Sequence, residues 1–324
     1  MVKGISLLSG GLDSMLAICV LREQGIEMEG LVFQSPFFDS QPAQEAAAQL
    51  NVPLHVLDFT TDIFGLVRCP THGFGGAMNP CIDCHAMMIL RAGEFMRQGG
   101  YDFVSTGEVL NQRPMSQNRR SLEVVAESSG LAHLLLRPLS AQLLEPTAPE
   151  LDGRVDRSRL CAISGRSRQE QLALVKKYGI RKYPSPAGGC LLTEKGFCRK
   201  LKDLFDHSDD VTAADVELLK YARHFRLPDG ARAIVGRNRN DNQNLKTLSA
   251  QGKTILYTVN VPGPTAAILG DATDADLLRV AEILASYGDK GDLPEVIVRV
   301  ITPSDSQDLS VKSLPRETYV AWML

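Results

Sequence analysis

Short apolar runs alternate with amphipathic stretches through the first part of the chain. Apolar runs predict strands at 5–8, 28–33, 53–57 and 103–105, and apolar residues at helical spacing predict helices at 15–24, 43–50 and 87–98. This alternation is typical of an α/β domain with a parallel, doubly wound sheet, whose ligands bind at the carboxyl ends of the strands. Phe33 ends the second strand, so we expect it near a nucleotide base; a place in the core is an equal alternative.

The pattern changes after an acidic helix expected at 211–224. Strands are predicted at 231–235, 254–259, 266–268 and 295–300, with a helix at 273–287 whose N-cap is Thr273 and a polar turn at 237–242. These elements make a smaller α+β domain. We therefore expect three parts: an α/β domain at 1–205, a helical linker at 206–228 and the smaller domain at 229–324.

The loop between the first predicted strand and helix reads Ser9-Gly10-Gly11-Leu12-Asp13-Ser14. Glycines let the backbone approach an anion closely, and the N–H groups and positive dipole of a helix start bind phosphate. The loop lacks the Lys of a GxxxxGK[ST] loop and the third glycine of a dinucleotide GxGxxG loop. The sequence therefore predicts a phosphate site of another type, and an ordinary glycine turn is the alternative.

Composition narrows the class of protein. The 324 residues carry a net charge of −3 and are 44% hydrophobic, with no apolar stretch long enough to cross a membrane and no charged, apolar leader. We expect a cytoplasmic protein of about two domains that does not bind membranes. Seven cysteines in such a protein are candidates for metal, redox or catalytic chemistry rather than for disulfides.

Basic residues gather between 154 and 202, where thirteen Lys or Arg residues accompany three acids. Such an excess is typical of a surface that binds a polyanion, and a solvated helix is the common alternative. We expect nucleic acid as the partner, because so few acids interleave. The candidate RNA-binding residues are Arg113, Arg119, Arg166, Arg168, Lys176, Lys177 and, in the tail, Arg237.

Three cysteines form another candidate site. Cys81 and Cys84 make a CxxC motif at the start of a predicted helix, and Cys190 follows a Pro/Gly-rich loop at 185–189. A helix N-terminus lowers the pKa of a thiol, so we expect at least one of the pair to act as nucleophile, persulfide carrier or metal ligand. Three thiolates can hold a [4Fe–4S] cluster with one open iron, whereas zinc would need a fourth ligand such as His72 or His85.

With these motifs the chain resembles a tRNA sulfurtransferase of the ATP-pyrophosphatase (PP-loop) superfamily over about its first 200 residues, the size of one domain. The Ser9–Ser14 loop and Asn79-Pro80-Cys81 are similar to 2-thiouridylases. Three further motifs are similar to 4-thiouridine synthases: Thr106-Gly107-Glu108 with Gln112, Ser116-Gln117, and Arg137-Pro138-Leu139. The three-cysteine set resembles cluster-dependent thiolation enzymes of archaea and some bacteria.

The resemblance implies ATP-dependent tRNA thiolation, in which a uridine carbonyl oxygen is adenylated and then replaced by sulfur to form 4-thiouridine at position 8. It implies a sulfur site at Cys81, Cys84 and Cys190, built as a [4Fe–4S] cluster or with a persulfide on Cys190. Asp13 would act in catalysis and hold Mg²⁺. The implied ATP contacts are Ser9, Gly10, Gly11, Asp13, Ser14, Phe33, Thr106, Gly107 and Gln112.

Other functions stay open as alternatives. Within the superfamily, a 2-thiouridylase acting at position 34 would use the same loop. A cluster-dependent thiouracil desulfidase would need no ATP, and an ATP-dependent amidating enzyme would not need the CxxC motif. A non-enzymatic RNA-binding factor would need only the tail.

Two parts typical of 4-thiouridine synthases are not found in the sequence: an N-terminal RNA-binding extension and a C-terminal rhodanese domain. We therefore expect the tail to bind RNA, because Val235-Gly236-Arg237-Asn238, then Asn242, then 261–264 resemble the RNA-binding module of NFACT proteins. A small dimerisation domain is the alternative, and whether two chains form a homodimer stays open. The sulfur donor would be a cysteine desulfurase persulfide or inorganic sulfide.

Overall fold

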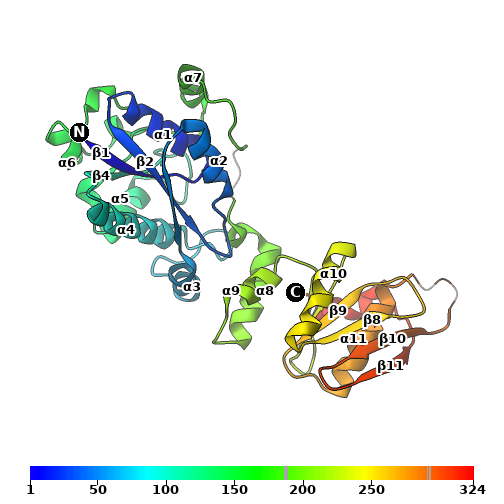
Figure 1. The fold of residues 1–324 in the computed structure, drawn as a ribbon. Helices are drawn as coiled ribbons and strands as arrows, with labels where there is room; N and C mark the ends of the chain where they lie inside the picture. The colour runs from blue at the N-terminus through cyan, green and yellow to red at the C-terminus, as the bar shows by residue number, and fades with distance from the viewer. Residues whose placement is uncertain (186–188, 290, 292) are drawn as a thin grey trace. The chain divides into compact units, whose positions relative to one another are not determined.

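The computed structural model describes residues 1–185, 189–289, 291 and 293–324. These residues form two compact units, Met1–Lys195 and Gly196–Leu324, each with its own sheet (Figure 1). Within the described ranges, no helix is both long enough and apolar enough to span a membrane. The units are described separately.

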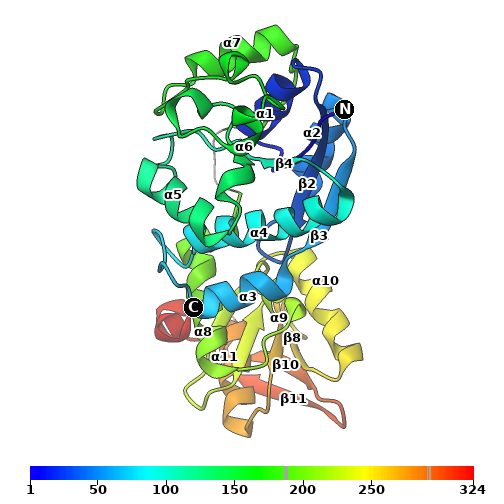
Figure 2. The same cartoon turned by 90° about the vertical axis from the view of Figure 1, so that its left-hand side faces the viewer.

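The first unit is a parallel sheet with helices on both faces, as the sequence predicts (Figures 1 and 2). Its strand order is β3-β2-β1-β4-β5. The strands are β1 (Lys3–Leu7), β2 (Glu27–Gln34), β3 (Leu54–Asp58), β4 (Phe103–Ser105) and β5 (Leu135–Leu136). The helices are α1 (Leu12–Arg22), α2 (Gln41–Leu50), α3 (Thr60–Arg68), α4 (Cys81–Gly99), α5 (Arg119–Ser128), α6 (Ala148–Leu151) and α7 (Gln169–Tyr178).

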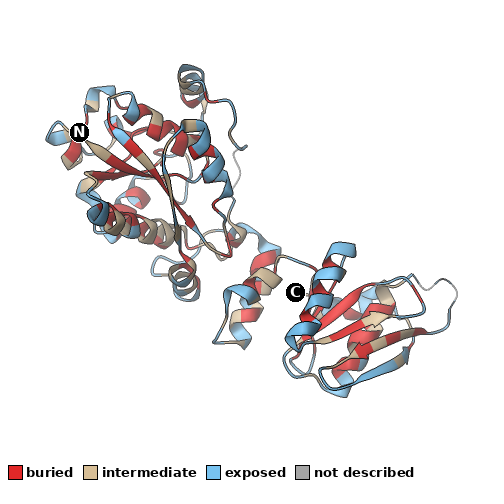
Figure 3. Cartoon of the chain, viewed as in Figure 1, coloured by how far each residue is buried: buried red, intermediate tan, exposed pale blue. Residues whose placement is uncertain are grey.

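The core of this unit lies on both faces of the central strands. Ile5 of β1 and Phe103 and Val104 of β4 are fully buried, as in a strand covered by helices on each side (Figure 3). α1 packs against α2 and α7, whereas α4 packs against α3 and α5. The alternation of apolar and amphipathic segments was therefore sufficient to predict the architecture.

The strand order reverses between β1 and β4. The chain moves from β1 outward through β2 to β3, and then returns to place β4 on the other side of β1. Ligands of open α/β sheets bind at such a point, outside the carboxyl ends of the two strands. The loops that leave β1 and β4 there are residues 8–11 and 106–118. They contain the two predicted ATP motifs.

The second unit is an antiparallel sheet with one long helix on each face. The strand order is β11-β10-β8-β9-β7-β6. Ala233 and Val235 face the core under α11 (Asp274–Tyr287), and Ile234 faces the core under α10 (Arg239–Thr247), as the alternation of a strand requires. The strands are β6 (Arg223–Arg226), β7 (Arg232–Val235), β8 (Thr254–Thr258), β9 (Thr265–Leu269), β10 (Val296–Ile301) and β11 (Ser306–Val311). The unit begins with α8 (Lys195–His207) and α9 (Ala213–Leu218).

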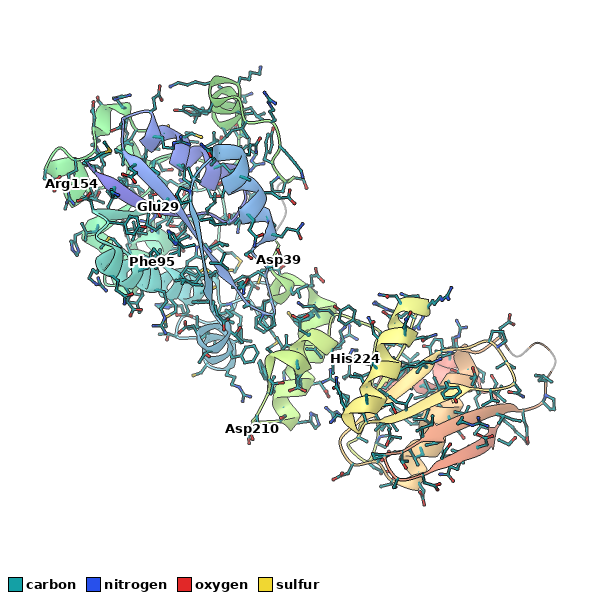
Figure 4. The ribbon with its side chains drawn as sticks, in the orientation of Figure 1. Glu29, Asp39, Phe95, Arg154, Asp210 and His224 are labelled. Carbon is teal, nitrogen blue, oxygen red and sulfur yellow. The ribbon has the colours of Figure 1, made fainter. Side chains whose placement is uncertain are left out.

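Two local predictions for this unit were wrong. The helix expected at 211–224 is only Ala213–Leu218, and His224, labelled in Figure 4, lies in β6; the positive φ of 61° at Ala222 separates the two elements. The polar turn expected at 237–242 is instead the start of α10, because the Asn238 side chain accepts from the Asp241 N–H at 2.9 Å and caps the helix. The N-cap at Thr273 is confirmed.

Candidate functional site

The loop after β1 forms a tight cradle at the start of α1. Gly10 has φ of +81°, and a Cβ there would lie 2.4 Å from the backbone of Pro42, so only glycine fits. The Ser14 hydroxyl donates to the Gly11 carbonyl oxygen at 2.8 Å and lies 3.4 Å from the Ser9 hydroxyl. The N–H groups of the first turn of α1 therefore face the space above the loop, where an anion would bind.

The loop after β4 packs directly against this cradle. A Cβ added to Gly107 would lie 2.4 Å from the Ser14 nitrogen and 2.6 Å from the Asp13 carbonyl carbon. Gly107 is therefore required for the close approach of the two loops. The structure thus brings together the two motifs that the sequence predicted as one ATP site.

One carboxylate oxygen of Asp13 has partners within the protein, and the other has none among the described residues. Gln112 donates to Oδ2 at 3.1 Å, and an Arg168 guanidinium nitrogen lies 3.5 Å from the same oxygen. Oδ1 is buried without a hydrogen-bond partner among the described residues. An unfilled carboxylate oxygen beside a phosphate cradle suits Mg²⁺, so the residues present fit the predicted ion.

A buried ion pair lies behind the cradle. Arg137 donates to Glu108 Oε2 at 2.8 Å, and His85 Nδ1 lies 3.0 Å from Oε1 of the same carboxylate. Burial raises the pKa of Glu108, but Arg137 and His85 together lower it well below its ordinary value. Glu108 is therefore a fixed carboxylate that joins three motifs: the TGE loop, the RPL segment and the histidine after the CxxC motif.

The three candidate cysteines interact with one another. Cys81 begins α4, and Cys84 lies one turn later. Burial raises the pKa of Cys84 well above its ordinary value, and the charges of Cys190 and Cys81 raise it further. The expectation of a lowered thiol pKa at the helix start fails at Cys84, because burial and like charges outweigh the helix dipole. Cys190, distant in sequence, lies close enough to Cys84 to raise the pKa of that thiol.

Backbone contacts place Cys190 at the carboxyl edge of the sheet. The N–H of Leu191 donates to the carbonyl oxygen of Phe37, in the loop after β2, at 3.1 Å. The Thr193 hydroxyl donates to the Cys190 carbonyl oxygen at 2.7 Å and closes a short turn. The preceding residues 186–188, part of the Pro/Gly-rich loop of the prediction, lie outside the described residues.

The histidines considered as zinc ligands have other partners. His72 Nδ1 lies 2.6 Å from the Asp83 carboxylate, and the backbone N–H of His72 donates to the same carboxylate. These two contacts join the loop before α4 to the CxxC segment. His85 is held by Glu108. In the part of the chain that the structure describes, no three His, Cys, Asp or Glu side chains are arranged as a metal site.

Phe33 has the contacts of a core residue. The residue is 5% exposed, and its ring centroid lies 5.1 Å from that of Phe59. Those contacts correspond to the alternative in which Phe33 packs in the core, and they do not place its ring over the cradle.

Many of the cations between 154 and 202 are paired with acids from outside that segment. Arg154, labelled in Figure 4, lies 2.6 Å from Asp152. The charge count along the sequence missed Asp152 and Glu150 because they lie just before residue 154, and it missed the acids that folding brings from distant elements. Arg166 and Lys176 are exposed and have no acidic partner in the described ranges. Other pairs among the described residues include Arg157–Glu150, Arg168–Asp13, Lys177–Glu23, Lys182–Glu45 and Lys202–Asp206.

The remaining predicted RNA contacts lie apart from that segment. Arg113 and Arg119 are exposed on the loop after β4 and the start of α5, and Arg119 donates to the Leu143 carbonyl oxygen at 2.8 Å. Arg237 lies in the second unit and contacts Asp241 at 3.0 Å.

Sequence reasoning missed three contributions to the site. Arg168 was expected on an RNA-binding surface, but it contacts the cradle. Arg137 and His85 hold Glu108, and the sequence offered only the RPL motif and the histidine after Cys84 as signals.

A glycine cradle after β1, an unfilled carboxylate beside it and a reversal of strand order at the same place define a PP-loop type of nucleotide-binding domain. Residues 2–142 match the family model "Thiamine biosynthesis protein (ThiI)", and residues 222–323 match "NFACT protein RNA binding domain". The chain is therefore similar to a ThiI domain over its first part and to an NFACT RNA-binding domain over its last part.

Curated relatives match the first domain. The tRNA-specific 2-thiouridylase MnmA of Chloroflexus aggregans is 28% identical over 170 residues, covering 45% of this chain and 47% of the relative. The "Probable tRNA sulfurtransferase" of Caldanaerobacter subterraneus subsp. tengcongensis is 33% identical over 149 residues, covering 42% and 36%. The chain spans about half or less of the length of these relatives.

Among solved structures, a 4-thiouridine synthetase in complex with RNA and ATP is 17% identical with a TM-score of 0.33, covering 55% of this chain and 51% of its own. The C-terminal part of the fibronectin/fibrinogen-binding protein of Streptococcus suis is 12% identical with a TM-score of 0.29, covering 75% and 93%.

Proposed function

We propose that this chain is an ATP-dependent tRNA sulfurtransferase that adenylates a uridine carbonyl oxygen and replaces it with sulfur. One observation carries the proposal. His85, next to Cys84, contacts Glu108 at 3.0 Å, and Glu108 follows Gly107, which packs on Asp13 and Ser14. The thiols are thus linked to the nucleotide cradle by a short, buried set of contacts, as sulfur transfer to an adenylated base requires.

The chemistry follows from the groups present. A carbonyl oxygen is a poor leaving group, so it first attacks the α-phosphorus of ATP, and pyrophosphate leaves. The cradle at 9–14 would bind that pyrophosphate through N–H and hydroxyl donors, and Asp13 would hold the Mg²⁺ that neutralises its charge. Arg168, beside Asp13, adds a positive charge where the leaving group develops negative charge.

The sulfur then attacks the activated carbon, and AMP leaves. In the persulfide form, the terminal sulfur on Cys190 makes the new bond to carbon. Cys84 or Cys81 then attacks Cys190 Sγ, so that the sulfur–sulfur bond breaks, thiouridine departs and a disulfide remains. A thiol reductant can reduce this disulfide, and a cysteine desulfurase persulfide then transfers its outer sulfur to Cys190. Inorganic sulfide would instead attack Cys190 Sγ in the disulfide, which forms the persulfide on Cys190 and releases the other cysteine as a thiol.

The target is 4-thiouridine at position 8, because the Thr106–Gln112 motif resembles 4-thiouridine synthases. A 2-thiouridine at position 34 is the second candidate, which the 2-thiouridylase relatives favour. Because tRNA and ATP meet in the cytoplasm, this location is part of the proposal.

Nucleoside mass spectrometry tests the function. A strain without the gene is expected to lose one thionucleoside, which the wild-type gene restores and Cys190→Ser does not. Cys69→Ser is the matched control, because Cys69 is exposed and is not one of the three candidate cysteines. The identity of the lost nucleoside distinguishes 4-thiouridine from 2-thiouridine. An unchanged thionucleoside profile would contradict the proposal.

The form in which sulfur is carried is the finer part of the proposal. Cys84 lies near both Cys81 and Cys190, and three thiolates match the donor set of a [4Fe–4S] cluster, which when bound would supply an open iron for sulfide. Because the described residues hold no ready-made three-ligand metal group, metal analysis has to test this part.

Protein purified without oxygen is expected to be brown and to contain about four irons per chain, the content of one cubane cluster. Cys84→Ser should lose most of that iron, whereas Cys69→Ser should keep it. If the protein contains zinc, or if metal-free protein still thiolates tRNA, the cluster proposal is wrong and the Cys190 persulfide remains as the sulfur carrier.

A further inference from the structure

The second unit has a cleft lined by four arginines. It has a volume of about 420 Å³ and lies at the start of α10. The arginines are Arg223 of β6, Arg237 and Arg239 at the start of α10, and Arg316. None of the ten described residues that line the cleft is acidic. A space of this size and charge fits a nucleotide or a sugar–phosphate unit.

Two of these arginines are held on one tyrosine. The guanidinium carbons of Arg223 and Arg316 lie 4.5 and 4.7 Å from the ring centroid of Tyr287. Arg223 also donates to the Gly236 carbonyl oxygen at 3.2 Å, and Arg316 donates to that of Ser286 at 3.0 Å. Because a guanidinium has five N–H groups, each still has donors for a ligand.

Neither guanidinium has a carboxylate partner among the described residues, in contrast to many cations of the first unit. Two positive charges at fixed positions and without counter-ions repel each other unless an anion binds between or beside them. Arg237 forms an ion pair with Asp241, which neutralises one of the four arginine charges, so the cleft keeps a net positive charge. These arginines therefore mark an anion site.

The backbone around the site is held closely. A Cβ added to Gly236 would lie 2.0 Å from Asn242 Oδ1, and that oxygen accepts the N–H of Thr265 at 3.0 Å. The cleft is thus shaped by packed glycine and asparagine, and the N-terminal end of α10 adds its partial positive charge. Its form does not depend on long side chains alone.

A second hollow of about 470 Å³ continues along α10. It shares Arg239, Asn242 and Gly263 with the cleft, and it adds a further cation on an aromatic ring, with Lys246 Nζ 5.4 Å from the centroid of Tyr257. Alternating cations and aromatic rings along a continuous track are typical of surfaces that follow a polynucleotide.

We propose that this α10 groove, defined by Arg223, Arg239, Lys246, Tyr287 and Arg316, binds the sugar–phosphate backbone of RNA. Arg223 and Arg316 contact phosphate beside Tyr287, and Lys246 contacts the chain further along. The match to an RNA-binding family model supports RNA over other polyanions but assigns no residue. The inference rests on the proposed function in taking tRNA as the RNA.

Binding of a fluorescent tRNA transcript to the full chain, measured over a range of salt concentrations, tests the groove. Arg223→Gln/Arg316→Gln is expected to raise Kd at least tenfold and to reduce the salt slope by about two, one for each lost phosphate contact. Arg226→Gln/Arg279→Gln is the matched control, because these arginines pair with Asp203 and Asp229 outside the groove. Fluorescence of the single Trp322, in the same unit, confirms that each variant is folded.

A double variant with the wild-type Kd and salt slope would overturn the groove. Thionucleoside formation by the wild-type chain is measured in parallel. If the arginine variant loses tRNA binding but the wild type makes no thionucleoside, the groove is supported and the proposed function is contradicted. If thiolation proceeds and the variant still binds as the wild type does, the function stands and the groove fails.

Discussion

Replacing Asp13 by asparagine is expected to lower ATP-dependent pyrophosphate release by about 10²–10³-fold, the cost of removing one group that stabilises developing charge. Asp13 Oδ1 is the unfilled oxygen beside the cradle, and Oδ2 contacts Gln112 and Arg168. An amide keeps the shape but loses the negative charge, so it binds Mg²⁺ weakly and no longer balances Arg168. The measurement is pyrophosphate release with tRNA over a series of Mg²⁺ concentrations.

The variant is also expected to need more Mg²⁺ for half-maximal rate, which a loss of folding would not produce. Asp156→Asn is the control, because Asp156 caps a short turn through its side chain and an amide oxygen can accept the same N–H. A wild-type rate and Mg²⁺ dependence for Asp13→Asn would show that this carboxylate is not the metal ligand.

The fold of the first domain could be predicted because each short segment of its sequence indicates its own secondary structure. Each buried strand is an apolar run, each helix has its own periodicity, and the handedness of strand–helix–strand units leaves few topologies. The second domain was predicted less well, because α10 is polar on most of its surface. Its burial depends on Leu245, and on Leu248 directly after the helix, which both contact a sheet that the local pattern does not show.

The candidate site divides in the same way. The cradle and the CxxC motif are contiguous in sequence, so their residue types and spacing predict them. The contact of Gly107 with Ser14 and that of Arg168 with Asp13 join segments far apart in the chain, and no periodicity reports them. The predicted topology placed both loops at the carboxyl ends of strands, but it did not identify which residues of these segments are in contact.

Charge patterning was the weakest guide. A count along 154–202 treats every Lys and Arg as available, yet acids such as Glu23 and Glu45 neutralise several of them. In the second domain, arginines separated by many residues along the chain, Arg223 and Arg316, meet on one tyrosine. A local excess of charge therefore indicates a partner only after folding shows which charges lack an acid.

Replacing Arg137 by methionine is expected to destabilise the first unit by about 3–5 kcal/mol, the cost of leaving a buried carboxylate without its charged partner. Glu108 and Arg137 are both almost fully buried, and the pair lies 2.8 Å apart. Methionine retains most of the volume but leaves His85 as the remaining partner of Glu108. Arg91→Met, which removes the surface ion pairs of Arg91 with Asp62 and Glu94, is the control and should cost about 1 kcal/mol or less.

The two units allow the loss to be located. Trp322 lies in the second unit, so its fluorescence transition in urea should be unchanged. Hydrogen exchange of peptides from β1 and β4 should become faster in Arg137→Met and stay unchanged in Arg91→Met. Equal exchange in all three proteins would show that the ion pair does not stabilise the site.

The pH dependence of the stability loss in Arg137→Met is a second, independent test of the ion pair. In the wild type, Arg137 and His85 keep the pKa of Glu108 low despite its burial, so the pair stabilises the fold at neutral pH and loses that contribution in acid. Without Arg137, burial raises the pKa of Glu108 above its value in the unfolded chain, and the folded variant binds the proton more readily. The deficit of Arg137→Met is therefore expected to shrink as pH falls from about 7 to about 5, whereas a simple packing defect would not change with pH.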